Sequence, residues 1–395
     1  MSKTQSLALQ LAQPWMERLS CLDQLPMQER IMYCNQVRME WMNTYFSATN
    51  EGISNIRLGH RLPSSHNQNH ISIPLTADQK HELITAVYDH LFQQASGWVE
   101  EILEQEGMGK APVPYACVLF GSGGRMEMTP WSDQDHGLVW DDSISLEAGS
   151  MEAYFAAWGE AFTRLLIQLG FPPCSGKVLA SNRQWRGSLK EWIARTKRWA
   201  VERGWENTRY LTMAMDMRAI YGATELEKQW RGSLNMVSPL LRLEVQRALI
   251  ANLLHRKPAH NSFGKLIRER YGEDAGRFDV KYRSYVPIVQ LARNTAWMEG
   301  QYAEALSTKE RLLRLSYSLE RDSSLDAAVR ETGVAWEMVL ESRLEALGCL
   351  VHGQWQSSGM VDPGRLTTVM KQGLKSSSHA INKWLRCLER RYLHD

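Results

Sequence analysis

A glycine-rich turn followed by a pair of aspartates constrains this chain more than any other feature. Residues 115–120 are apolar and β-prone, and we expect them to form a buried strand. They run into Gly121, Ser122, Gly123 and Gly124, whose small side chains let backbone N–H groups approach a ligand closely. A turn of this kind that opens a short helix is a cradle for phosphate oxygens.

Two carboxylates follow the turn. We expect a short helix over 125–128 that ends before Pro130, and then Asp133 and Asp135 at the start of a second apolar segment, 137–140. Side chains two apart on a strand share a face, so both carboxylates would point to one side, beside the glycine turn. Carboxylates this close raise each other's pKa, and a divalent cation between them would relieve the repulsion. Mg²⁺, which binds one or two carboxylates together with substrate phosphates, fits this arrangement.

Each half of the pattern also has an ordinary explanation. A Gly-Ser-Gly-Gly sequence by itself is in most proteins only a turn, and an Asp-x-Asp sequence by itself is a solvated strand end. Chance seldom places both together directly after a buried strand. The combination therefore predicts a nucleotide and metal site.

The stretch 115–140 resembles the signature of the DNA polymerase beta nucleotidyltransferase superfamily, which is an apolar strand, Gly-Ser, and Asp-x-Asp on the next strand. More narrowly, it is similar to bacterial uridylyltransferases and adenylyltransferases that modify nitrogen-regulation proteins. It is most similar to their uncharacterised relatives, which add a helical substrate-binding domain. Gln134 and His136 depart from the superfamily pattern, because apolar residues are common at those positions.

The resemblance implies an α+β fold and three parts of the chain. We expect a polymerase-beta-type domain with a small mixed sheet at 111–230, between an N-terminal helical region at 1–110 and a C-terminal helical, substrate-binding domain at 231–395. The N-terminal helices either form a layer on the catalytic domain or bind a partner. Between them, a polar loop contains His66 and His70, which are weak candidates for metal ligands because no helix or further ligand accompanies them.

Composition excludes several classes of protein. A formal net charge of +2 and a pI near 8.2 are too modest for a dedicated nucleic-acid binder. The six cysteines show no C-x-x-C spacing, so neither a disulfide framework nor a zinc ribbon is indicated. No apolar run is long enough to span a membrane and no apolar leader is visible, so we expect a cytoplasmic protein without a membrane partner.

Two features after the motif have competing interpretations. Lys177 lies where a basic side chain would reach a triphosphate, although a surface lysine is the plainer explanation. Trp185, Trp192 and Trp199 are seven residues apart with basic residues between them. Interleaved basic and aromatic residues are found in nucleic-acid-binding surfaces. At this spacing, however, we favour the buried face of one helix.

Asp216 is the candidate for a third carboxylate. It interrupts the apolar segment 211–222, where a lone carboxylate is costly to bury unless it is paired or bound to a metal. Alternation along a strand would place Arg218 on the same face, so an ion pair between the two is the alternative. The resemblance implies that Asp216 supplies the third metal-site carboxylate.

The C-terminal part shares a further element with the uncharacterised relatives. Residues 278–293 resemble the opening of their helical domain. Asp279, Lys281 and Arg293 would either face the active cleft or form an internal ion-pair network. The sequence leaves this choice open.

The activity implied by the resemblance is Mg²⁺-dependent transfer of a nucleoside monophosphate from a nucleoside triphosphate, UTP or ATP, to a hydroxyl acceptor. The 121–124 turn, the Ser122 hydroxyl and Arg125 would hold the phosphates, and Asp133, Asp135 and Asp216 would hold two Mg²⁺ ions. The implied acceptor is a tyrosine of a small signal protein of the PII type, which would be uridylylated or adenylylated.

Other activities stay open on the sequence. The chain could be a nucleotide-binding regulatory module without turnover, and an Asp216 directed away from Asp133 would support that reading. A small-molecule nucleotidyltransferase of the antibiotic-modifying kind would need an acceptor pocket between the catalytic and helical domains. A nucleic-acid enzyme is disfavoured by the modest net charge. The base, the acceptor and the oligomeric state are not determined by the sequence.

Overall fold

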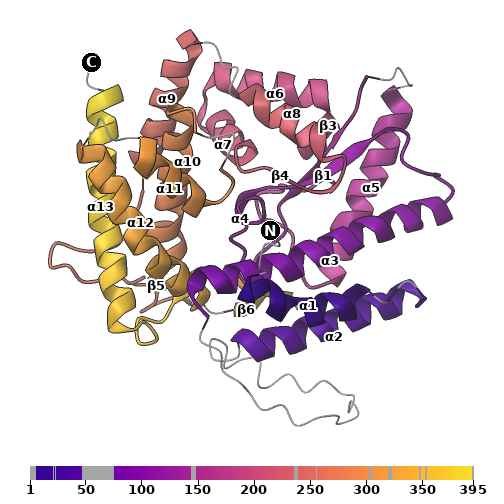
Figure 1. The fold of residues 1–395 in the computed structure, drawn as a ribbon, viewed down its shortest axis with the longest axis horizontal. Coiled ribbons are helices and arrows are strands. Elements are labelled where there is room, and N and C mark those ends of the chain that lie inside the picture. The colour runs from indigo at the N-terminus through magenta and orange to yellow at the C-terminus, as the bar shows by residue number, and fades with distance from the viewer. Residues whose placement is uncertain are drawn as a thin grey trace, which may run out of the picture.

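The computed structural model describes residues 6–20, 22, 24–46, 75–143, 148–234, 239–254, 256–301, 305–318, 323–346, 348–351 and 354–393. A small mixed sheet lies between helices, and helices also form the two ends of the chain (Figure 1). This confirms the predicted α+β class. His66 and His70 lie outside the described residues.

The sheet brings the two halves of the motif to one edge. Its order is β3-β2-β1-β4, with β1 antiparallel to both β2 and β4, and β2 parallel to β3. In this register Leu119, at the end of β1, pairs with His136, at the start of β2. The residues that follow β1 and those that precede β2 are therefore neighbours. The strands are β1 (Tyr115–Leu119), β2 (His136–Trp140), β3 (Arg186–Ser188) and β4 (Arg218–Gly222).

The N-terminal helices form a layer on the sheet. Buried side chains of α1, α2, α3 and α5 share one apolar cluster with Cys117, Leu119 and Leu138 of the central strands. One of these helices spans residues 27–46, and Thr76 and Gln79 form a capping box at the start of α3. These helices are α1 (Leu7–Ser20), α2 (Met27–Phe46), α3 (Ala77–Gln105) and α5 (Ala148–Gln168).

Three tryptophans fill the opposite face of the sheet, as the core interpretation predicts. Trp185, Trp192 and Trp199 are buried and pack around Phe120 and one another. They do not belong to one helix, however. Trp185 lies in the 3-10 turn η3 (Arg183–Trp185), because the chain must first form β3 before α6 begins. The helices on this face are α6 (Leu189–Glu202), α7 (Trp205–Ala214) and α8 (Thr224–Leu234).

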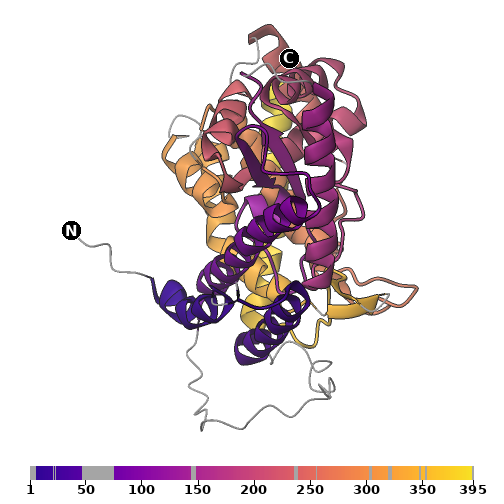
Figure 2. The same ribbon diagram turned by 90° about the vertical axis from the view of Figure 1, so that its right-hand side faces the viewer.

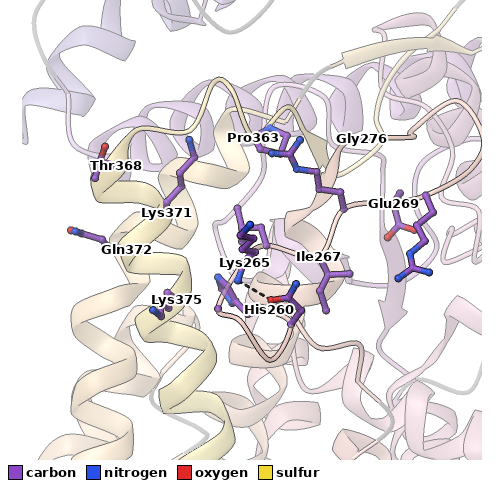
Figure 3. A pocket seen from close by; sticks show the side chains of 15 residues that line it. His260, Lys265, Ile267, Glu269, Gly276, Pro363, Thr368, Lys371, Gln372 and Lys375 are labelled. Atoms are coloured by element: carbon purple, nitrogen blue, oxygen red, sulfur yellow. Dashed lines mark hydrogen bonds between the residues drawn. The ribbon is translucent and has the colours of Figure 1, made fainter.

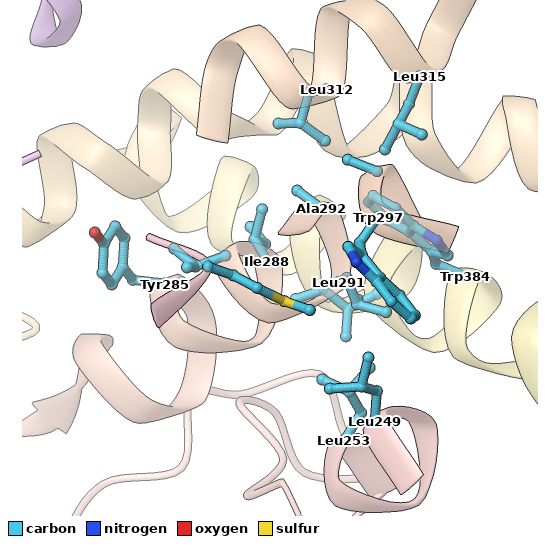
Figure 4. Packing of buried hydrophobic residues seen from close by; sticks show 14 of the residues in the cluster. Leu249, Leu253, Tyr285, Ile288, Leu291, Ala292, Trp297, Leu312, Leu315 and Trp384 are labelled. Atoms are coloured by element: carbon cyan, nitrogen blue, oxygen red, sulfur yellow. The ribbon is translucent and has the colours of Figure 1, made fainter. Parts of the chain in front are cut away.

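The C-terminal part is mainly a bundle of helices. Figure 4 shows its interior, where Leu291 and Trp297 of α10 pack near Leu249 of α9, Leu315 of α11 and Trp384 of α13. Figure 2 shows the bundle beside the sheet and its helical layers. The bundle contains α9 (Pro239–Leu254), α10 (Val286–Met298), α11 (Thr308–Ser318), α12 (Ser323–Leu344) and α13 (Thr368–Tyr392).

Short irregular elements of this part matter for the site. The π-helical turn η4 (Lys281–Tyr285) leads directly into α10. Single π turns inside helices are frequent at functional sites. It follows β5 (Phe278–Asp279), which pairs with β8 (Met360–Val361), and a separate pair is formed by β6 (Gly348–Val351) and β7 (Gln354–Ser357).

None of the helices in the described residues combines the length and the apolar character needed to cross a bilayer.

A buried histidine makes the stability of this fold sensitive to acid. His81 of α3 donates from Nδ1 to the carbonyl oxygen of Met128 at 2.9 Å, so Nε2 carries no proton. Burial and the charge of Arg343 lower the pKa of His81 to about 4. Between pH 6.5 and that value the unfolded chain therefore binds a proton that the folded chain does not.

We expect the free energy of unfolding to fall by up to about 3 kcal/mol as the pH drops from about 6.5 to about 4, and His81→Gln to remove this part of the loss. Urea unfolding of the wild-type protein and of His81→Gln, each at about pH 7 and about pH 5, measures this change in the free energy of unfolding. An identical pH dependence in the two proteins would show that His81 does not contribute.

Candidate active site

The glycine turn is itself helical. The single helical turn α4 spans Gly121–Gly124, Arg125 ends it, and Met126 adopts a left-handed φ of 61°. The sequence predicts a short helix four residues later, over 125–128, and this prediction is wrong. The left-handed backbone of Met126 ends the helical turn, and the side chains of Arg125 and Glu127 on either side of it are both buried.

Two glycines of this turn are required by close approach. Gly121 has a φ of +53°, and a Cβ there would lie 2.8 Å from Oδ2 of Asp135. A Cβ on Gly124 would lie 1.6 Å from the carbonyl oxygen of Asp216. The backbone N–H of Phe120 also donates to the carbonyl oxygen of Asp135 at 3.0 Å. The turn and the second aspartate are therefore in direct contact.

The two aspartates line one cavity with the glycine turn, as predicted. The cavity has a volume of about 260 Å³, and its lining includes Gly121, Ser122, Asp133 and Asp135. Oδ1 of Asp135 is buried and has no hydrogen-bond partner in the described part of the chain. Burial and the charge of Asp133 raise the pKa of Asp135 to about 7. A cation between the carboxylates would remove both of these penalties.

Gln134 and His136, the two departures from the superfamily pattern, form a buried polar chain. Gln134 donates from Nε2 to the carbonyl oxygen of Phe171 at 3.0 Å, and its Oε1 lies 2.6 Å from Nε2 of His136. The backbone N–H of Ala180 donates to Nδ1 of His136 at 3.1 Å, so the proton of this ring is on Nε2. Burial lowers the pKa of His136 to about 3, which keeps it neutral. These bonds fix the backbone that carries the aspartates.

Asp216 has a different environment from the one predicted. Its Oδ2 accepts from Arg125 at 2.6 Å and from Arg293 at 2.7 Å, and its Oδ1 accepts from Arg311 at 2.6 Å. Burial alone would raise the pKa of Asp216, but the three arginine charges outweigh it and hold the pKa well below its ordinary value. Both oxygens are thus occupied by protein partners.

The structure does not bring Asp216 together with Asp133 and Asp135. Asp216 is absent from the lining of the cavity, and no group of three or more His, Cys, Asp or Glu residues suited to a metal ion occurs among the described residues. Three buried arginines are the physical reason, since their charges take the place that metal ions would have. The assignment of Asp216 as a third metal ligand is therefore corrected.

The alternative ion pair between Asp216 and Arg218 is not formed either. Alternation does not apply, because α7 continues to Ala214 and β4 begins only at Arg218, which leaves Asp216 in the turn between them. Arg218 instead pairs with Asp89 of α3 through two bonds of 2.7 and 2.8 Å. It also donates to the carbonyl oxygen of Gly123, so it supports the glycine turn from behind.

The predicted phosphate-binding residues are only partly at the cavity. Gly121 and Ser122 line it, whereas Gly123 and Gly124 are buried. Arg125 lines the cavity, but its three guanidinium nitrogens bond to Glu127, Asp216 and the hydroxyl of Tyr285. A phosphate would have to compete with those partners.

Lys177 is exposed, lies in a left-handed turn with a φ of 54°, and is not among the described residues that line the cavity. The surface interpretation fits this position better than a triphosphate contact.

Besides Arg125, the cavity has basic side chains from parts of the chain that the motif does not cover. Lys281 of η4, Arg209 of α7 and Arg343 of α12 all belong to its lining. The sequence allows Lys281 either to face the cleft or to join an internal network, and in the structure it lines the cleft. Asp279 and Arg293 do not line it, since Asp279 accepts from the backbone N–H of Tyr282 and Arg293 binds Asp216. Arg209 and Arg343 carry no local sequence signal.

Comparison with known families gives two matches. A family described as "Putative nucleotidyltransferase DUF294" matches residues 66–206. A family described as "Putative nucleotidyltransferase substrate binding domain" matches residues 244–392. No curated protein matches the chain.

Replacing Asp216 should destabilise the whole protein. Asp216→Asn would leave three buried guanidinium groups without their shared counter-charge, and removing one partner of a buried pair typically costs about 3–5 kcal/mol. Urea unfolding measures this loss. Asp89→Asn is the matched control, because Asp89 binds one arginine and is more exposed, and we expect a smaller loss. Equal losses in the two variants would contradict the central position of Asp216.

Gly121→Ala should destabilise the protein through strain at the site. The added methyl group would meet Oδ2 of Asp135 in a backbone conformation that side chains rarely adopt, at a cost of about 1–3 kcal/mol. Gly97→Ala within α3 is the control. Nothing lies within 4 Å of the added atom, and alanine there should stabilise the helix by about 1 kcal/mol. Thermal unfolding measures both changes in stability. If the two substitutions changed the stability in the same direction, this interpretation would be contradicted.

Proposed function

Because the chain carries a nucleotidyltransferase domain followed by the substrate-binding domain of the same kind, we propose that it transfers a nucleoside monophosphate from a nucleoside triphosphate to a hydroxyl acceptor. The observation that supports this most is the cavity that joins Gly121 and Ser122 to Asp133 and Asp135. One set of groups suits phosphates and the other suits a cation, and nucleotidyl transfer needs both next to each other.

The donor set at the cavity fits Mg²⁺. Asp133 and Asp135 would hold it, and the unpartnered Oδ1 of Asp135 is a ligand position that no protein group uses in the described residues. Cys174 also lines the cavity, and burial and the charge of Asp135 raise the pKa of its thiol. Mg²⁺ prefers oxygen ligands, so the two carboxylates suit it better than this sulfur. When bound, Mg²⁺ supplies neutralisation of the phosphate charge.

The residues of the chain would then position the reactants. The Ser122 hydroxyl and the backbone N–H groups of the first helical turn bind the terminal phosphates, and Lys281 adds positive charge from the other domain. Tyr282, which is 53% exposed at the cavity, offers a ring face for the base. The acceptor oxygen attacks the α-phosphorus, the bond to the β-phosphate breaks, pyrophosphate leaves, and the hydroxyl proton passes to solvent.

A finer assignment of substrates rests on the resemblance described above. UTP or ATP would be the donor, and a tyrosine of a PII-type signal protein would be the acceptor. A small-molecule acceptor is the alternative within the same chemistry. Residues of both domains line the cavity, so either acceptor would approach between them.

A second candidate function is nucleotide binding without turnover. The environment of Asp216 favours it, because the carboxylate that would help the acceptor lose its proton is neutralised by arginines. The chain would then sense a nucleotide at the same cavity. The two candidates predict different behaviour in one assay.

The assay follows label from each of four α-labelled nucleoside triphosphates in the presence of Mg²⁺ and a lysate of the source cell. For a transferase, we expect label on a discrete protein band or small molecule, and a decrease of at least about a hundredfold with Asp133→Asn. Asp141→Asn is the matched control and should leave transfer unchanged, because Asp141 lies just after β2 and its side chain accepts from the backbone N–H and the hydroxyl of Ser143.

If no label moves but the wild-type protein binds a nucleotide that Asp133→Asn does not bind, the binding module is supported instead. Transfer at a near wild-type rate by Asp133→Asn would remove this residue from the mechanism. Binding is measured separately by equilibrium dialysis with the same labelled nucleotides.

A further inference from the structure

A second and larger cavity lies in the C-terminal part, between the segment 260–276 and the start of α13. Its volume is about 890 Å³, which is within the range of small-molecule sites. Figure 3 shows His260, Lys265 and Ile267 on one wall and Lys371 and Lys375 of α13 on the other. It has no lining residue in common with the candidate active site, so the two cavities are separate sites.

The lining of this cavity is strongly basic. Within the described residues, no ion pair or side-chain hydrogen bond neutralises the five lysines and arginines that line it. Its single carboxylate, Glu269, already binds Arg283 at 2.8 Å. The cavity therefore has an unbalanced positive charge in a protein whose formal net charge is only +2. The five basic residues are Lys265, Arg268, Arg270, Lys371 and Lys375.

Other groups of the cavity also favour an anion. Asn261 accepts at Oδ1 from the backbone N–H groups of Phe263 and Lys265, both at 3.0 Å, which leaves its Nδ2 as a donor. Thr368, the first residue of the 25-residue helix α13, is in the lining, so the positive end of that helix dipole is at the cavity. Burial and the charges of His379 and Lys375 lower the pKa of His260, in keeping with a positive local field.

The shape selects among anions. Nucleic acid would need a basic surface that continues beyond one hollow, and the small net charge of the protein does not supply it. A compact hollow with a basic rim and apolar side chains, Leu266 and Ile267, in its wall suits a small molecule with several phosphate charges and an apolar part.

We propose that the cavity between segment 260–276 and α13 is a second ligand site, which binds a small polyphosphorylated molecule of the nucleoside diphosphate or triphosphate class. Lys265, Lys371 and Lys375 contact its phosphates from two sides. An ion pair links this site to the candidate active site. Glu269, in the lining of the second cavity, binds Arg283 of η4. The same turn places Lys281 and Tyr282 in the lining of the cavity at the glycine turn.

The test measures binding of tripolyphosphate and of ATP to the full chain by calorimetry, with EDTA present to suppress binding that needs Mg²⁺ at the aspartates. We expect one equivalent of each to bind. The variant Lys265→Gln/Lys371→Gln/Lys375→Gln should bind both tripolyphosphate and ATP at least about tenfold more weakly, because it lacks three charge-assisted contacts.

The matched control is Lys190→Gln/Lys228→Gln/Lys383→Gln, which removes the same charge from other surfaces. It should bind like the wild-type protein. Five of the six lysines are exposed and Lys383 is half-buried, so circular dichroism verifies that both variants are folded. Asp133→Asn/Asp135→Asn should also bind like the wild-type protein, which separates this site from the catalytic cavity.

Equal affinity of the two triple variants would overturn the proposal, as would absence of binding to the wild-type protein at millimolar ligand. An oligoglutamate peptide that binds while tripolyphosphate does not would overturn it as well, because the surface would then recognise protein. If the Lys265→Gln/Lys371→Gln/Lys375→Gln variant bound tripolyphosphate more weakly but bound ATP as the wild-type protein does, the site would not be one for nucleotides.

Discussion

The buried carboxylate of Asp216 is the interaction on which the rest of the structure depends. Its three arginine partners are Arg125 directly after α4, Arg293 of α10 and Arg311 of α11, so one anion connects the sheet domain to the helical bundle. Arg125 also reaches Glu127 and Tyr285, and Glu127 accepts from the backbone N–H of Thr308 at 2.7 Å. Charges buried this deeply are stable only while every partner is in place. The glycine turn and η4 are therefore held at a fixed separation, and the cavity between them is preformed.

The parts of the site that sequence predicts well are those determined by short spacing. A buried strand, a run of small residues and two aspartates two apart specify a local geometry, and β1, α4 and the start of β2 reproduce it with only a shift of the helical turn. The remaining lining could not be found in this way. Arg209, Lys281 and Arg343 reach the cavity through packing of α7, η4 and α12, and nothing in their neighbours marks them.

Asp216 and His136 show that a sequence can indicate a buried polar group correctly without identifying the groups that bind it. A single acid in an apolar segment correctly indicated a buried charge that needs compensation. The compensation was assigned to a metal or to the nearby Arg218, whereas it comes from arginines 77, 91 and 95 residues away. At His136 the polar side chain in a buried strand was noticed as a departure. Its partners are Gln134 and a backbone N–H group, and backbone groups leave no trace in a residue pattern.

The long sequence separation of these ion pairs has a consequence for how the protein is made. Asp216 and Arg125 leave the ribosome while Arg293 and Arg311 have not yet been added to the chain. N-terminal domains generally begin to fold during synthesis. Here the carboxylate of Asp216 lacks two of its three arginine partners until α10 and α11 have been synthesised. The part of the chain that contains the glycine turn cannot complete its folding before then. A truncated product that stops before Arg293 would therefore be a target for chaperones and proteases, and the cell would accumulate the cavity beside the glycine turn only in finished chains.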